Sequence, residues 1–128
     1  MVLYIDTTES GLIYLALAPD RKSLNRKRHT AEAEIAAQYD HAEKLLPQID
    51  KLCRQGNITA EDLDKIIVNN ENGSFSALRI GVVTANALGY ARRIPVESLK
   101  RDINPTVRNK YKPVRPVYSR EPNITVKN

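Results

Sequence analysis

The amino-acid sequence predicts an α/β fold in which helices pack on one mixed, five-stranded sheet. Three observations support it. Short β-type runs fill the first thirty residues, two longer segments have the 3.6-residue period of helices, and a short β-branched run lies between those segments. The length of 128 residues fits one domain with one hydrophobic core.

The first thirty residues predict three antiparallel strands in succession. Residues 2–5 and 12–18 are apolar runs, and residues 23–30 form a third run that carries far more charge. Gly11 and Pro19 mark the turns between them. The charge of the third run suits an exposed edge of the sheet, where charged side chains discourage unwanted pairing.

The pattern then changes to a helical period. Apolar residues recur at helical spacing between residues 42 and 53, with Asp40 as a candidate N-cap and Gly56 as a stop signal. Residues 59–62 have capping-box spacing and predict a single short turn. Residues 65–68 are too short and too β-branched for a helix, so they predict a fourth strand.

Residues 75–92 predict a second helix with one unusual feature. Ala77, Gly81, Ala85 and Gly89 recur at steps of four and therefore lie on one stripe of the helix. Two glycines inside a helix cost roughly 1 kcal/mol each, so they require a packing reason. Either the chain's own sheet or a helix of another chain could pack closely here. Residues 94–96 then lead into a fifth strand. This element order is typical of the ribonuclease-H-like or actin-like half-fold.

Charge divides the chain into two regions. Residues 1–99 hold 12 Lys/Arg and 13 Asp/Glu, whereas residues 100–128 hold 8 basic and 2 acidic residues together with four of the seven prolines. We therefore expect a lobe over residues 1–99 and a basic, Pro-rich tail over residues 100–128. The tail is either a solvated arm or a contact for RNA phosphates. No apolar run approaches the ~18 residues of a membrane span, which predicts a cytoplasmic protein.

Few residues are candidates for catalysis. Asp6, Glu43 and Glu71 would converge in a ribonuclease-H-like sheet and could hold two metal ions for a nuclease. His29 and His41 lack the spacing of a zinc site and suit capping or surface roles. The single Cys53 excludes a disulfide within the chain and fits the apolar face of the first helix.

Five segments resemble the TsaB (YeaZ) family in the same order along the chain. Residues 41–47, His-Ala-Glu-Lys-Leu-Leu-Pro, are similar to that family's His-Ser-Glu-x-Leu-Leu-Pro helix. Residues 72–81 are similar to its Gly-Pro-Gly-Ser-Phe-Thr-Gly-Leu-Arg-Ile-Gly signature. The remaining matches are residues 3–8, 94–96 and 116–122.

The resemblance implies an actin-like fold and a non-catalytic role in making threonylcarbamoyladenosine in tRNA. Family members bind and support the catalytic subunit TsaD, and many also self-associate. The implied contact surface is the helix after the Ser-Phe motif, and it agrees with the stripe of small residues. The predicted interface residues are Phe75, Ala77, Leu78, Gly81, Ala85 and Gly89.

Two departures from the family pattern change what is expected. The signature begins with Glu71 and Asn72 instead of Gly-Pro, and Ala77 replaces its later glycine, so this loop is less permissive and more acidic. Too few residues separate the fifth strand from the matching tail segment for the family's second lobe. We therefore expect a one-lobed member with no complete ATP site and no cofactor. The alternatives are the metal-dependent nuclease and an RNA-binding adaptor that acts through the tail.

Overall fold

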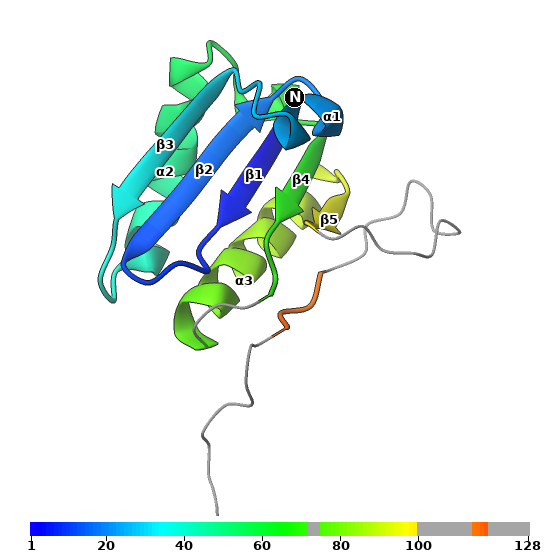
Figure 1. Ribbon diagram of the computed structural model, residues 1–128. Helices are drawn as coiled ribbons and strands as arrows, with labels where there is room; N and C mark the ends of the chain where they lie inside the picture. Colours follow the sequence, from blue (N-terminus) through cyan, green and yellow to red (C-terminus); the bar gives the residue numbers. More distant parts are fainter. Residues whose placement is uncertain (72–74, 100–113, 118–128) are drawn as a thin grey trace, which may run out of the picture.

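A computed structural model describes residues 1–71, 75–99 and 114–117 of the chain (Figure 1). Five strands and three α-helices form in this part, together with one 3-10 turn. In chain order they are β1 Val2–Asp6, β2 Leu12–Ala18, α1 Arg21–Asn25, β3 Ala31–Ala36, α2 His41–Gln55, η1 Ala60–Asp62, β4 Lys65–Val68, α3 Phe75–Arg92 and β5 Val96–Ser98.

The strands form one mixed sheet in the order β3-β2-β1-β4-β5. β2 pairs antiparallel with both β1 and β3, whereas β4 pairs parallel with both β1 and β5. This confirms the predicted α/β class and the mixed five-stranded sheet. Because β1 and β4 are parallel, their carboxyl ends meet at one edge of the sheet, and α3 begins just beyond that edge.

The two faces of the sheet are covered differently. Helices α2 and α3 lie on one face (Figure 1), where alternate strand residues such as Leu3, Ile5 and Leu15 are fully buried in the main core. The other face carries a smaller apolar cluster around Leu24 of α1. Side chains that alternate along the strands therefore contribute to the main core on one face and to the smaller cluster on the other.

The third strand was predicted at residues 23–30, and this position is wrong. Residues 21–25 form α1, because the Asp20 side chain accepts a hydrogen bond from the Ser23 backbone N–H (2.7 Å) and caps a helix. The strand itself is β3, in which Ala and Glu alternate with the period of a half-buried strand. Ala and Glu have low β-propensity, so pairing with β2 decides this segment.

The other predicted elements form where expected. Helix α2 begins after Asp40, whose carboxylate makes no cap hydrogen bond and instead pairs with Lys44 (2.9 Å). The predicted short turn is η1, where the Thr59 N–H donates to the Asp62 carboxylate (2.8 Å). Most of the predicted tail, residues 100–113 and 118–128, and residues 72–74 of the signature lie outside the described residues. No helix in the described part is both long enough and apolar enough to span a membrane.

Candidate functional site

The start of α3 is held tightly against the end of β1. Thr7 is almost fully buried, and its hydroxyl donates to the Ala77 carbonyl oxygen (2.6 Å). One turn later, a Cβ atom at Gly81 would collide with the Thr7 Oγ1. The small residues at positions 77 and 81 therefore allow this helix to approach its own sheet closely.

Most of the predicted interface residues are buried within the chain. Ala77 is 7% exposed, and Leu78 and Ala85 are fully buried. The backbone position of Gly89 is buried as well, and the side chain of Phe75 lies outside the described residues. The intramolecular alternative thus explains the small residues at the start of the stripe, while contact with another chain stays a prediction.

A second stripe on α3 faces solvent and was missed by the sequence reasoning. Val83 is 56% exposed and Tyr90 is 72% exposed, and Ala87 between them is exposed too. Ile80, half-buried and packed against the main core, continues the line toward the start of α3. We call Ile80, Val83, Ala87 and Tyr90 the outer stripe. Their alternating steps of three and four are the signal that could have revealed it.

The Asp6 carboxylate at the end of β1 is saturated with hydrogen bonds. One oxygen accepts from the Tyr4 hydroxyl (3.0 Å) and the Asn69 side-chain amide (3.2 Å). The other accepts from the Thr8 backbone N–H (2.8 Å) and hydroxyl (2.6 Å). Burial and the nearby Asp6 charge raise the pKa of Tyr4 far above its ordinary value, so Tyr4 remains a neutral donor. Asp6 thus ties the end of β1 to the end of β4.

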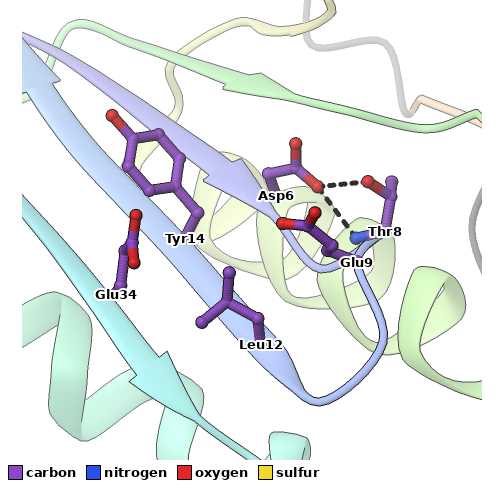
Figure 2. Close-up of a pocket in the computed structure, with 6 residues that line it drawn as sticks. All are labelled: Asp6, Thr8, Glu9, Leu12, Tyr14 and Glu34. Carbon is purple, nitrogen blue, oxygen red and sulfur yellow. Dashed lines mark hydrogen bonds between the residues drawn. The ribbon is translucent and has the colours of Figure 1, made fainter.

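Asp6 also borders a hollow of about 440 Å³ on the face opposite α2 and α3. Figure 2 shows Tyr14 and Glu34 projecting from neighbouring strands beside it, with Glu9 and Thr8 on the β1–β2 turn and Leu12 below. Burial and a hydrogen bond to Glu32 raise the pKa of Tyr14, which keeps this hydroxyl protonated. The polar side of the hollow is therefore made of carboxylates and hydroxyls.

The three carboxylates of the nuclease hypothesis do not form a site in the described structure. Within the described residues, no group of three or more His, Cys, Asp or Glu side chains is arranged to hold a metal ion. Asp6 is saturated as above, Glu43 is exposed on α2, and Glu71 lies in a bridge with Val117. The expected convergence of Asp6, Glu43 and Glu71 is therefore wrong.

Both histidines are more buried than the sequence suggested. The side chain of His29 is 10% exposed and its Nδ1 lies 3.0 Å from the Glu32 carboxylate. His41 is 7% exposed at the start of α2, and its Nε2 has no hydrogen-bond partner among the residues that the structure describes. The prediction for Cys53 is confirmed: it is 3% exposed, and burial raises the pKa of its thiol.

Residues 114–117 pack against the carboxyl edge of the sheet. The Asn86 side chain of α3 makes two hydrogen bonds with the Val114 backbone, to the carbonyl oxygen (2.7 Å) and from the N–H (2.8 Å). The Asn70 amide donates to the Arg115 carbonyl (2.6 Å). A short piece of the predicted tail is therefore part of the lobe, and no spacing in the sequence indicates it.

Comparison with known proteins shows what the chain is similar to. A tRNA N6-adenosine threonylcarbamoyltransferase of Nitrosospira multiformis is 37% identical over 60 residues, or 47% of this chain and 17% of that protein. An uncharacterized protein of Mycobacterium tuberculosis is 39% identical over 56 residues, or 44% of this chain and 26% of that protein. The chain thus spans about a quarter or less of the length of these relatives.

Solved structures show the same fold. The structure described as YeaZ from Pseudomonas aeruginosa superposes with a TM-score of 0.64 and 22% sequence identity. The superposition covers 77% of this chain and 42% of that chain. A second structure, described as similar to peptidase YEAZ from the same organism, gives a TM-score of 0.65. The described part of the chain therefore has the actin-like fold of YeaZ, at the extent of a single lobe.

Family membership follows from a match over a longer stretch of sequence. The model of the family described as "TsaD: tRNA N6-adenosine threonylcarbamoyltransferase" matches residues 32–101, from β3 to just past β5. That range is more than half of the chain, and it includes both helices of the main core. The chain therefore belongs to the TsaD family of tRNA N6-adenosine threonylcarbamoyltransferases.

Proposed function

We propose that the chain is a non-catalytic, TsaB-like subunit that binds and supports a TsaD catalytic subunit in the threonylcarbamoyladenosine modification of tRNA. Membership of the TsaD family supports a role in the threonylcarbamoyladenosine modification of tRNA, and the YeaZ-like fold supports the TsaB-like role. The observation that carries the proposal is the outer stripe of α3. It offers an apolar helix surface on a lobe whose own core is already filled.

The outer stripe has the geometry of a helix–helix contact. Its members recur at steps of three and four, which keeps them on one side of the helix over about three turns. Val83 and Tyr90 leave most of their apolar surface in water. Burying such surface contributes roughly 25 cal/mol per Å², so a helix of a partner would gain stability by covering it.

The six residues predicted as the interface have a supporting role in this proposal. Ala77, Gly81 and Ala85 hold α3 close to the sheet, which fixes the direction in which the outer stripe faces. The partner then contacts the same helix on its solvent side. Because the surface is a single stripe, a second copy of the chain and TsaD would compete for it. We propose that the homodimer and the complex with TsaD exclude each other.

The experiment measures assembly and activity with variants of the outer stripe. Val83→Glu and Tyr90→Glu place a charge in the proposed contact, and each should weaken binding to a TsaD protein by roughly tenfold or more. Both residues are exposed, so circular dichroism and melting temperature should stay close to those of the unmodified chain. Light scattering and a pull-down with TsaD measure assembly, and the yield of threonylcarbamoyladenosine in tRNA measures support of catalysis.

Tyr39→Glu is the matched control. Tyr39 is a fully exposed tyrosine in the loop before α2, away from α3, so the same substitution there should leave binding within about twofold. If Val83→Glu and Tyr90→Glu bind TsaD as well as the Tyr39→Glu control does, α3 is not the contact and the interface proposal fails. If the unmodified chain neither binds TsaD nor raises the yield of modified tRNA, the subunit role itself fails.

A further inference from the structure

Strand β3 is an open edge of the sheet with a hollow on each of its two faces. Among the described residues it is the outermost strand in the order β3-β2-β1-β4-β5 and pairs only with β2. The hollow of about 440 Å³ described above lies on one face. A second hollow of about 370 Å³ lies on the other face, between β3 and α2. Glu34 borders both of them.

The register shows which backbone groups of β3 point away from β2. Ala37 donates its N–H to the Gly11 carbonyl, on the inner side of the strand. Backbone groups alternate in direction along an antiparallel pair, so Ala33 and Ile35 also bond inward. The N–H and C=O groups of Glu32 and Glu34 then point outward. These groups are the template that an added strand requires.

One end of this open edge is closed by a side chain. The Lys44 ammonium group donates to the Ala36 carbonyl oxygen (2.9 Å), which occupies the next outward-facing carbonyl. The available stretch is therefore centred on Glu32 and Glu34. It is long enough to pair with a short extended segment.

The two faces of the edge differ in chemistry. Glu32 and Glu34 are both exposed on the face that carries Tyr14, and Glu34 makes no hydrogen bond or ion pair with a described residue. The hollow on this face also has Glu9 at its border (Figure 2). On the α2 face, Ala33, Ile35 and Leu52 line the second hollow together with Gln48, Lys51 and Gln55, so this side offers both apolar and polar contacts.

Repulsion between carboxylates disfavours a second copy of β3 as the added strand. Two copies of β3 could pair antiparallel in two registers. If the pair is centred on residue 33, Glu32 of each copy lies opposite Glu34 of the other. If it is centred on residue 34, the two Glu34 side chains lie opposite each other. Like charges directly opposite each other destabilise a strand pair. A complementary strand instead carries Lys or Arg at alternate positions, with apolar residues between them.

We propose that β3 binds an extended segment of another protein in which Lys or Arg alternates with apolar residues, as a sixth strand of the sheet. Its backbone bonds the outward groups of Glu32 and Glu34. Its basic side chains lie against Glu34 and the carboxylate-lined hollow, and its apolar side chains pack on Ala33, Ile35 and Leu52 in the hollow between β3 and α2. This surface is separate from the outer stripe of α3, so the proposed subunit role does not depend on it.

The test uses the full chain, labelled with ¹⁵N, and the peptide acetyl-Thr-Lys-Val-Arg-Val-Lys-Thr-amide. Titration should shift the amide resonances of Glu32 and Glu34 most and slow their hydrogen exchange, because both N–H groups gain acceptors. A peptide of the same composition in the order Lys-Arg-Lys-Val-Val-Thr-Thr should bind at least tenfold more weakly. The same should hold for a peptide with N-methylated amides at alternate residues.

Two protein variants separate the site from general charge attraction. Glu34→Lys should weaken peptide binding by roughly tenfold or more, since it reverses the charge beside the added strand. Glu61→Lys makes the same change at an exposed position of η1 and should change the affinity by less than about twofold. Equal binding of the alternating and reordered peptides, or equal effects of the two variants, would overturn the proposal. An absence of shifts at β3 would overturn it as well.

Discussion

At the start of α3, the buried side chain of Thr7 determines which residue can occupy position 81. Thr7 is an almost fully buried polar residue, and its hydroxyl is satisfied only because the Ala77 carbonyl lies within hydrogen-bond distance. The same hydroxyl oxygen occupies the space that a side chain at position 81 would fill. The helical cost of Gly81 is thus offset by the close contact that it permits.

Gly81→Ala should destabilise the chain, because the added methyl group collides with the Thr7 hydroxyl in a packed region. Overpacking of this kind costs roughly 1–3 kcal/mol. In a Thr7→Ala background the collision is removed, and Gly81→Ala should then be neutral or stabilising, since alanine favours helix by up to ~1 kcal/mol. Urea unfolding of the four variants in this double-mutant cycle measures the coupling. Equal effects of Gly81→Ala in both backgrounds would contradict the packing argument.

At the scale of elements, α1 is the clearest case of local chemistry and long-range contacts acting together. Asp20 caps the helix, and Leu24 packs into the smaller apolar cluster on the sheet. Arg21 reaches across this face to the Glu97 carboxylate of β5 (2.8 Å). Glu97 also pairs with Lys65 of β4 (3.0 Å). A helix of five residues is too short to be stable alone, so these contacts hold it in place.

The free energy of unfolding of Asp20→Asn should decrease less in acid than that of the unmodified chain. The hydrogen bond from the Ser23 backbone lowers the pKa of Asp20 below its ordinary value of 3.8 in the folded chain. A lowered folded-state pKa contributes stability above pH ~4, and this contribution is lost as the pH falls further. The stability difference between the unmodified chain and Asp20→Asn should therefore shrink between pH 5 and pH 2.5, measured by urea unfolding.

The control for this prediction is Glu61→Gln, which removes one negative charge from an exposed side chain of η1. The lowered pKa values of Glu32 and Asp40 are common to all three proteins, so they cancel in the differences. If the difference for Asp20→Asn is independent of pH, the cap does not contribute through its charge.

At the scale of the whole molecule, one face of the sheet carries the main core and the other carries polar networks. The network around Asp6 ties the carboxyl ends of β1 and β4 together, next to the start of α3. Asn86 and Asn70 attach residues 114–117 near the same edge. The carboxyl edge is therefore a structural junction in the described part of the chain. The surfaces that we propose for assembly are the outer stripe of α3 and the open edge at β3.

Millimolar Mg²⁺ or Mn²⁺ should leave the melting temperature unchanged within about 1 °C. An ion at Asp6 would have to displace hydrogen bonds from Tyr4 and Thr8, and the described residues offer it no cluster of further carboxylates. Thermal unfolding with and without the ions measures the effect, and a nuclease assay runs in parallel. A rise of several degrees that Asp6→Asn abolishes, together with cleavage of nucleic acid, would restore the nuclease hypothesis.

Residue spacing and composition were enough to predict the α/β class, the mixed sheet and most of the elements. Periodicity is a local property, so α2, α3 and β4 could be located from the spacing of apolar residues. Ordered motif matches also indicated the TsaD and YeaZ relationship, because a series of matches along one chain is specific. The stripe of small residues correctly marked α3 as a helix that packs closely.

Tertiary structure decided what the local patterns left open. The sequence offered two partners for Ala77 and Gly81, and only the position of Thr7 shows that the chain's own sheet packs against them. Residues 31–36 became a strand through pairing with β2, against the low β-propensity of Ala and Glu. Burial depends on contacts between residues distant in sequence. For this reason only the folded chain shows that the outer stripe of α3 and the edge of β3 are exposed, although the spacing of the outer stripe is visible in the sequence.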